Sequence, residues 1–481
     1  MKLTAYLLFL YGLLALPAYP QIGIGGQPHP SAVLDLKSPA NDKAFYPPRL
    51  TTAQRKAIVN PQVGAFVYDL DKGALYMFDG QNWSPLAFTT TNSLAPIDRT
   101  ANDGAAGDFF GYGVAISGDY AIVGAYSNDI GANINQGAAY IFTRTGGTWI
   151  QQAKLIANDG ASGDVFGSSV AISGDYALVG AYNDDIGANA DQGSAYVFVR
   201  SGSTWAQQAK LTANDGATND YFGTNVAISG DYAIVGAYSD DVGANTDQGS
   251  AYVFVRNGSS WTQQAQLTAN DGAANDIFGL SVAVSGDYAI VGASGDDIGT
   301  KLNQGSAYVF VRNSTNWTQQ AKLTASTFDG SANDYFGSSV AISGDYAIVG
   351  VYNRTNSFNG NSGQGAAFVF VRAGSSWTQQ SFLTADDGAV GDFFGSSVAI
   401  SGDYAIVGAY NNDIGANTNQ GSAYVFVRNG SSWRSLRTIS DNSTANTQNG
   451  LSVGLSNGVF IIGGPGFESG KGKVSFGAVE N

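Results

Sequence analysis

The segment Gly174-Asp175-Tyr176-Ala177-Leu178-Val179-Gly180 decides the fold, because nearly the same seven residues occur six times in the chain. The copies begin at Gly118, Gly174, Gly230, Gly286, Gly344 and Gly402. The intervals are 56, 56, 56, 58 and 58 residues, and residues 456–463 align with 401–408 as a weaker seventh copy. A fixed period of this length predicts one supersecondary unit repeated seven times, each unit burying its apolar surface against its neighbours.

Each unit contains enough alternating apolar sequence for four strands. In the second unit, residues 166–173 and 175–181 predict a hairpin across a Ser-Gly-Asp turn. Residues 193–200 predict a third strand that is apolar on both faces, and residues 205–213 a more polar fourth strand. Four antiparallel strands per unit, with the third buried on both sides, indicate the blades of a β-propeller. A linear solenoid is the alternative, but it needs polar capping units that neither end supplies.

The two ends of the repeat array complement each other. The last unit stops after its third strand, residues 471–479, and residues 93–101 register on the fourth strand of the other units. The sequence therefore predicts an all-β protein, a seven-bladed β-propeller of four-stranded antiparallel blades over residues 93–481, closed by the N-terminal strand at 93–101. Residues 83–86 are a rival for the closing strand, because they contain a tryptophan as the fourth strands of six units do.

The first twenty residues have the pattern of an export signal. Lys2 precedes an apolar run over residues 3–16, and residues 17–20 offer a processing site. The run is short for a membrane span. We therefore expect a signal peptide at 1–20 and no integral membrane segment after processing. The predicted location is secreted, or associated with the cell surface or outer membrane, and residues 21–92 form a separate small module.

Composition narrows the partners and the sources of stability. The chain carries a formal charge of -15 with a pI near 4.3, which repels phosphate backbones and excludes nucleic acid as a partner. It has no cysteine, so neither disulfides nor thiolate metal sites are available. Stability must come from packing.

These units resemble the FG-GAP repeats of integrin α subunits, and more closely the bacterial variant found in secreted and surface proteins. The Phe-Gly pairs are 110–111, 166–167, 222–223, 278–279, 336–337 and 394–395, and the Gly-Ala pairs are 124–125, 180–181, 236–237, 292–293 and 408–409. Residues 21–92 resemble a leader segment of bacterial surface and tail-fibre-like proteins. The resemblance implies a propeller used for adhesion or ligand binding, displayed by a module through which the chain can form a homo-oligomer.

Aspartates gather in the loops that lead into each unit and in those between its second and third strands, which a meander places on one face. Two interpretations stand side by side: hard-oxygen sites for Ca²⁺, or turn formation by Asp, Asn and Gly without an ion. The family's own calcium loop is not carried over, because here it is only Ser-Gly-Asp. The candidate metal-ligating residues are Asp159, Asp164, Asp184, Asp185, Asp191, Asp215, Asp220, Asp240, Asp241, Asp247, Asp271, Asp276, Asp296 and Asp297.

Catalysis finds little support in the sequence. The only histidine is His29, and the only glutamates are Glu468 and Glu480, so acid–base work would fall to aspartates that recur identically between units. We expect a non-enzymatic, exported binding or adhesion protein whose partner is an extracellular protein or a carbohydrate, with Ca²⁺ as its only candidate cofactor. The alternatives are a glycan-processing enzyme of sialidase-like propeller type and a structural surface or fibre component. The seven tryptophans, six at equivalent fourth-strand positions and one upstream, would favour a lectin if their rings were exposed.

Overall fold

A computed structural model describes residues 22–24, 34–36, 48–63, 65–71, 74–78, 80–85, 96–325, 330–355, 360, 362–440 and 444–479. It divides into two compact units, Met1–Ser93 and Leu94–Asn481. The predicted signal peptide lies outside the described residues. No helix in the part of the chain that is described is long and apolar enough to cross a membrane.

The first unit is built on a small mixed sheet. Strands β3 (Arg49–Leu50), β4 (Phe66–Asp69), β5 (Ala74–Phe78) and β6 (Trp83–Pro85) lie in that order, and β1 (Ile22–Ile24) pairs with β2 (Leu34–Leu36) separately. Helix α2 (Thr52–Lys56) starts at a capping box in which Thr51 and Gln54 bond reciprocally. From this helix the buried Arg55 reaches Asp69, with 2.7 Å between Nε and Oδ2. The rival closing segment therefore belongs to this sheet, through β6.

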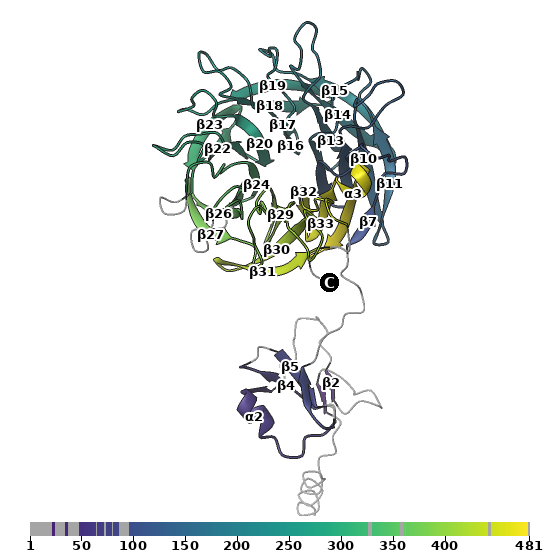
Figure 1. Ribbon diagram of the computed structural model, residues 1–481, viewed down its shortest axis with the longest axis vertical. Coiled ribbons are helices and arrows are strands. Elements are labelled where there is room, and N and C mark those ends of the chain that lie inside the picture. Colours follow the sequence, from purple (N-terminus) through teal and green to yellow (C-terminus); the bar gives the residue numbers. More distant parts are fainter. Residues whose placement is uncertain are drawn as a thin grey trace, which may run out of the picture. The chain divides into compact units, whose positions relative to one another are not determined.

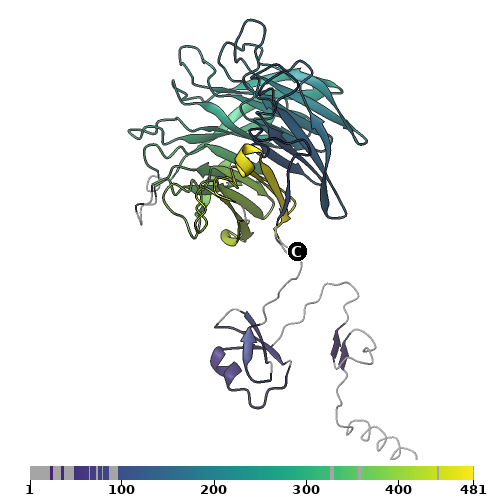
Figure 2. The same ribbon diagram turned by 45° about the vertical axis from the view of Figure 1, so that its right-hand side comes forward.

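The second unit contains seven four-stranded antiparallel sheets among its described residues, arranged about a common axis (Figures 1 and 2). The first three sheets are β8 (Val114–Ser117), β9 (Tyr120–Ala125), β10 (Ala138–Thr145), β11 (Thr148–Leu155); β12 (Val170–Ser173), β13 (Tyr176–Ala181), β14 (Ser194–Ser201), β15 (Thr204–Leu211); and β16 (Val226–Ser229), β17 (Tyr232–Ala237), β18 (Ser250–Asn257), β19 (Ser260–Leu267).

The next three sheets are β20 (Phe278–Ser285), β21 (Tyr288–Ala293), β22 (Ser306–Asn313), β23 (Asn316–Leu323); β24 (Ser339–Ser343), β25 (Tyr346–Val351), β26 (Ala366–Ala373), β27 (Ser376–Leu383); and β28 (Ser397–Ser401), β29 (Tyr404–Ala409), β30 (Ser422–Asn429), β31 (Ser432–Ile439). The last sheet joins β32 (Ser452–Ser456), β33 (Val459–Gly464) and β34 (Lys473–Ala478) to β7 (Ile97–Arg99), and α3 (Phe467–Gly470) precedes β34.

The innermost strands are shorter than predicted. The second unit was expected to begin its first strand at Phe166, but β12 begins at Val170. Positive φ angles at Val165 (54°) and Gly167 (95°) turn the backbone there, and Phe166 instead forms a parallel bridge to Gly137 of the preceding sheet. Only in the fourth sheet does the strand, β20, include its Phe-Gly pair. The Phe-Gly segment thus links neighbouring sheets.

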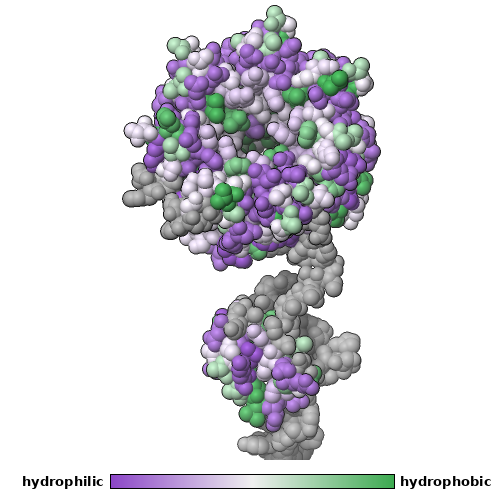
Figure 3. Space-filling view, viewed as in Figure 1, coloured by the Kyte–Doolittle hydropathy of each residue, from purple (hydrophilic) through white to green (hydrophobic). Residues whose placement is uncertain are grey.

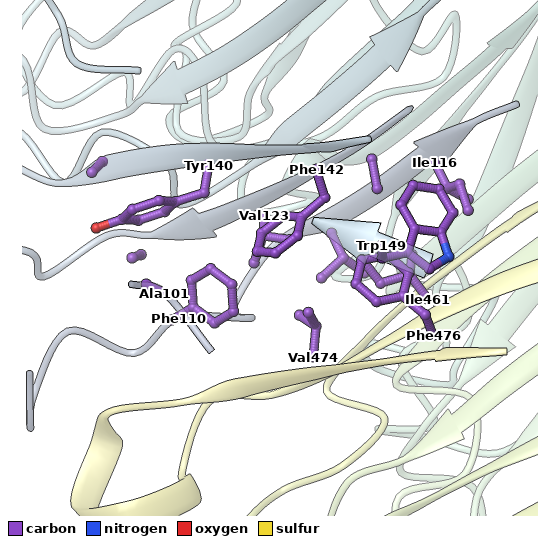
Figure 4. Close-up of a cluster of buried hydrophobic side chains, with 14 residues drawn as sticks. Ala101, Phe110, Ile116, Val123, Tyr140, Phe142, Trp149, Ile461, Val474 and Phe476 are labelled. Carbon is purple, nitrogen blue, oxygen red and sulfur yellow. The ribbon is translucent and has the colours of Figure 1, made fainter. Parts of the chain in front are cut away.

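The outer strand of the last sheet comes from the predicted segment 93–101. Strand β7 pairs antiparallel with β34, with Arg99 opposite Val474 and Ile97 opposite Phe476. Figure 4 shows the buried side chains at this junction: Phe142 and Trp149 of the first sheet lie against Phe476 of the last, and the Trp149 and Phe476 rings stack at 4.4 Å. Residues from both ends of the repeat array therefore share one core.

The tryptophans of the outer strands join neighbouring sheets. The half-buried Trp205 donates its Nε1–H to Gln152 Oε1 of the preceding sheet at 3.0 Å, and its ring meets Tyr120 edge-on. Equivalent bonds run from Trp261, Trp317, Trp377 and Trp433 to Gln208, Gln264, Gln320 and Gln380. These rings pack between sheets, so they do not offer the exposed platforms that a tryptophan-based lectin requires.

Candidate functional site

The acidic loops of neighbouring sheets meet at one end of the sheets. Asn189, in the loop between β13 and β14, donates through Nδ2 to the carbonyl oxygen of Gly216, in the loop that leads to the third sheet. Asn245 makes the same contact with Gly272 one repeat later. The fourteen candidate aspartates lie in these paired loops, where they fall into five positions with different partners.

The first position, Asp159 and its equivalents Asp215 and Asp271, is paired with lysine in two of these three repeats. Lys210 Nζ lies 2.7 Å from both Asp159 Oδ2 and Asp184 Oδ2, and Lys322 bridges Asp271 and Asp296 at the same distances. Burial works to raise the pKa of Asp159 and Asp271, but the adjacent lysine outweighs it and lowers both. The lysine ammonium occupies the place between the two carboxylates.

The second position is a buried cap of the loop that leads into each sheet. Asp164, Asp220 and Asp276 each accept, through Oδ2, the backbone N–H three residues earlier at 2.6 Å. Burial raises the pKa of each of the three to about 6, against the backbone hydrogen bond that lowers it. These buried carboxylates therefore stabilise the turn through a hydrogen bond to its backbone.

The other three positions shape the loop between the second and third strands. Asp184, Asp240 and Asp296 are buried and accept the phenol hydroxyls of Tyr196, Tyr252 and Tyr308 at 2.8, 2.8 and 2.9 Å. Asp185, Asp241 and Asp297 are exposed and accept the backbone N–H six residues later. Those amides belong to Asp191, Asp247 and Asn303, and all three of these residues have positive φ. The turn chemistry that the sequence offered as an alternative to calcium accounts for every one of these contacts.

The third sheet departs from this pattern. Gln266 stands where Lys210 and Lys322 stand in the second and fourth sheets, and its Nε2 donates to Asp240 Oδ2 at 3.0 Å. Burial, together with the charge of Asp215, raises the pKa of Asp240. Of the three candidate pairs of acids, this one lacks a cationic neighbour. Among the described residues no three ligating side chains of His, Cys, Asp or Glu converge, and calcium binding at the candidate aspartates stays a prediction from sequence.

Arginines lie at the opposite ends of the sheets, beside the Ser-Gly-Asp turns. Arg200 pairs with Asp175 and lies 4.5 Å from the centre of the Tyr120 ring of the preceding sheet. The same pairing joins Arg144, Arg256, Arg312, Arg372 and Arg428 to Asp119, Asp231, Asp287, Asp345 and Asp403. Each arginine is thus neutralised by an aspartate of its own sheet.

Sequence reasoning overlooked a band of half-exposed aromatic rings near the axis. Rings from the position before the Phe-Gly pair stack on rings from the position after the Gly-Ala pair: Phe109 on Tyr126 at 5.4 Å, Tyr221 on Tyr238 at 5.4 Å, and Tyr335 on Tyr352 at 5.6 Å. The signal was present in the phrases Phe109-Phe110-Gly111, Tyr221-Phe222-Gly223 and Gly236-Ala237-Tyr238. It went unnoticed because these positions are more than ten residues apart within a unit.

The axis itself is hollow. A cavity of about 500 Å³ is lined by the first strands of all seven sheets, by Tyr112, and by Tyr182 and Tyr238 of the aromatic band. Figure 3 shows the depression at the centre of the second unit. Burial raises the pKa of Tyr182 to about 12, with the phenols of Tyr112, Tyr126 and Tyr238 adding to the shift. Tyrosines from several sheets therefore converge at this cavity.

Repeated four-stranded antiparallel sheets around an axis define the second unit as a β-propeller. Residues 99–142, 149–198, 205–254, 261–310, 317–370 and 377–426 match the model of the FG-GAP repeat, and together they make up more than half of the chain. The protein belongs to the FG-GAP repeat family. Residues 21–96 match the model of a phage tail like trimerisation region. A comparison with curated proteins gives no match.

Proposed function

We propose that this chain is an exported, non-enzymatic binding or adhesion protein that presents closed seven-bladed propellers as a trimer. One observation carries the proposal: a region similar to phage tail trimerisation regions precedes an FG-GAP unit in the same chain. A trimerisation region brings three copies of whatever follows it to one place. FG-GAP propellers are suited to presenting a surface for adhesion or for structure.

Closure of the propeller is supported by contacts between the ends of the repeat array. Ser452 Oγ, in the last sheet, donates to the carbonyl oxygen of Gly111 in the first at 2.9 Å. The equivalent bonds inside the array, from Ser281 to Gly337 and from Ser397 to Gly450, join adjacent sheets. The junction between the last and first sheets therefore repeats the junctions inside the array, as closure requires.

A trimer would strengthen weak contacts. When three propellers share one base, the second and third binding events become intramolecular, and avidity can exceed the single-site affinity by about 10²–10⁴ without any new contact. This suits a protein that holds a surface carrying many copies of its ligand.

The arginines favour binding over sialidase-type catalysis. A sialidase-like site needs arginines free to hold a substrate carboxylate, whereas each of the six repeat arginines is paired with the aspartate of its own turn. The pairing recurs from sheet to sheet, and it leaves no distinctive cluster of catalytic groups in the part of the chain that the structure describes.

The test begins with the mass of the purified full chain by sedimentation equilibrium. One chain weighs 49.8 kDa before processing, and we expect about three times the mass of the processed chain. The trimer should then bind to intact cells or extracellular matrix with a lower apparent dissociation constant than a form lacking residues 21–92. A monomeric mass, or equal binding by both forms, would refute the proposal.

A structural role in a surface fibre is the second candidate, favoured by the match of residues 21–96 to a tail-like region. It predicts assembly beyond the trimer. Electron microscopy of the concentrated full chain separates the two, because a fibre component forms filaments and an adhesion trimer stays discrete.

A further inference from the structure

One position of the repeat lines the axial cavity in every sheet, and its residue type differs from sheet to sheet. The residue after each Phe-Gly pair, or after Asn449-Gly450 in the last sheet, lines the cavity in every sheet. In chain order these residues are Tyr112, Ser168, Thr224, Leu280, Ser338, Ser396 and Leu451. By contrast, the Gly-Asp-Tyr-Ala-(Ile/Leu)-Val-Gly segment is nearly identical in six of the repeats. The seven residues at the cavity supply one phenol, four aliphatic hydroxyls and two leucines, and the leucines interrupt the hydroxyls at two separate places around the ring.

The next position along the strand is used to join sheets. Ser169 Oγ accepts the backbone N–H of Val226 at 3.0 Å, and Asn225 Oδ1 accepts that of Val282 at 3.0 Å. Ser281 Oγ donates to the carbonyl oxygen of Gly337 at 2.7 Å. These side chains have structural partners and are not available to a ligand.

The Ser168 hydroxyl differs from them. Ser168 is 8% exposed and lines the cavity, and its buried Oγ has no hydrogen-bond partner. A buried hydroxyl without a partner costs about 1–3 kcal/mol. The Oγ of Ser168 is closed off from solvent in this rotamer, so a ligand hydroxyl in the cavity would complete it once the side chain rotates about χ1.

Aromatic rings border the same cavity on one side. Tyr112 is 41% exposed and packs edge-on against Tyr126 at 4.6 Å, and Tyr182 meets Tyr221 at 6.1 Å. Both aromatic positions are lost in the fourth sheet, where they hold Ile277 and Ser294, and in the last sheet, where they hold Gln448 and Pro465.

Ser338 and Ser396 donate to the carbonyl oxygens of Gly350 and Gly408 at 3.4 Å, which leaves Ser168 as the hydroxyl of this ring that is shown to be unpaired. Ring faces beside hydroxyl groups suit a ligand that has apolar faces and hydroxylated edges.

We propose that the axial cavity binds one end of a neutral carbohydrate chain, with a sugar ring stacked on Tyr112 and its hydroxyls bonded to Ser168 and the neighbouring Thr224. This deepens the proposed binding function and rests on it. None of the described residues that line the cavity is charged, so a charged ligand would enter without a partner for its charge. The surrounding acidic loops further disfavour anionic sugars. The volume of about 500 Å³ falls within the range of about 300–1,000 Å³ typical of small-ligand sites.

The experiment screens the full-length protein on an array of neutral and sialylated glycans and follows each hit by titration calorimetry with the free oligosaccharide. We expect one neutral glycan per propeller and no preference for sialylated forms. Tyr112→Ala should weaken binding about tenfold, the size of a lost stacking contact, while Tyr112→Phe retains binding. Thr224→Trp should abolish binding by filling the cavity. Ile150→Ala, a change at an exposed outer-strand residue, is the matched control, and thermal melts confirm that every variant folds.

Several results would overturn the axial site. They are binding to no neutral glycan on the array, binding that Tyr112→Ala and Thr224→Trp leave intact, or capture of an arginine-rich peptide at the same tyrosines in place of a glycan. If the trimer still adheres to cells in the Thr224→Trp variant, the axial site fails while the proposed adhesive function stands. If no trimer forms but the glycan still binds each propeller, the axial site stands while the proposed trimeric adhesion protein is refuted.

Discussion

At the scale of single residues, a glycine sets how closely two sheets approach. A Cβ on Gly180 would lie 2.0 Å from the carbonyl oxygen of Gly223 in the next sheet, and the equivalent distance from Gly124 to Gly167 is 1.8 Å. Both atoms belong to backbone that other hydrogen bonds hold in place. The Gly of each Gly-Ala pair is therefore required by packing between sheets, because no side chain fits there.

Gly180→Ala should cost about 3 kcal/mol or more, since the added methyl must displace the backbone of the neighbouring sheet. Chemical denaturation measures it. Gly202→Ala is the control: Gly202 has φ of 62° with open space around its Cβ position, and its substitution should cost only about 1–2 kcal/mol. Equal costs for the two variants would contradict the packing argument.

Gln266→Lys should stabilise the third sheet, because the new ammonium would lie between Asp215 and Asp240 as Lys210 lies between Asp159 and Asp184. For such a partly exposed pair we expect a gain of up to about 1 kcal/mol, larger at low salt. Differential scanning calorimetry measures it, with Thr438→Lys as control, since that side chain would meet Asp387 without a second acid.

The same melts with millimolar calcium test the ion prediction. A rise in Tm that is present in the natural protein and absent from Gln266→Lys would place a cation between Asp215 and Asp240. Superimposed melting curves with and without calcium would leave these aspartates as turn formers.

At the scale of the strand, the outer strands β11, β15, β19 and β23 each use two adjacent glutamines for two joints. The first, such as Gln207, accepts the backbone N–H of Asn158 in the loop before its own sheet at 3.0 Å. The second, such as Gln208, lies in a β-bulge between Val197 and Phe198 of the partner strand and accepts the Nε1–H of Trp261 in the next sheet. The bulge lets two consecutive glutamines reach different partners, one in the loop before their own sheet and one in the next sheet. The Gln-Gln pair therefore recurs in these strands.

Strand β7 has no such pair and depends on Asp98. Its carboxylate accepts Lys473 Nζ at 3.1 Å and Ser475 Oγ at 2.6 Å across the β7–β34 junction, and Lys473 is 2% exposed. Asp98→Ala should therefore loosen the last sheet at a cost of about 1–3 kcal/mol. Hydrogen exchange should quicken in β34 more than in β30 of the preceding sheet. Equal protection in the two sheets, or an equal effect of the exposed Asp386→Ala, would argue against this role.

At the scale of the whole molecule, the buried carboxyls act together on the pH dependence of stability. Burial raises the pKa of Asp164, Asp220, Asp276 and Asp334 to about 6, from 3.8 in the unfolded chain. Because the pKa values are raised, the folded state binds more protons than the unfolded chain does between about pH 4 and pH 6. The stability contributed by these groups is therefore full below about pH 4 and lost as the pH rises through 6.

We expect a higher Tm at pH 5 than at pH 7.5, with stability falling again in stronger acid as Asp103, Asp159 and Asp271, whose pKa values lie below normal, become protonated. Calorimetric melts across this range measure it. The double variant Asp220→Asn with Asp276→Asn should flatten the difference between pH 5 and pH 7.5, while Asp386→Asn should not. A Tm that climbs steadily from pH 5 to 7.5 would contradict the assignment.

The sequence by itself determined the repeated unit, its four strands and the segment that supplies the outer strand of the last sheet. Those features follow from local patterns: turn residues between apolar runs, and a period that can be counted. The sequence could not show that Phe166 leaves its strand, because that depends on a backbone bridge to the preceding sheet.

Only the tertiary structure decided what the side chains of the repeats do. Asp184 is buried whereas Asp185 is exposed. Trp205 is held between sheets by a hydrogen bond to a glutamine 53 positions away, so its ring is not a platform for a sugar. Ser168 has no hydrogen-bond partner, whereas Ser169 has one. Each of these roles depends on atoms brought together from different units or different loops. Spacing along the chain places residues on strands, but the packing of one sheet on the next determines which polar groups are engaged and which still face the axis.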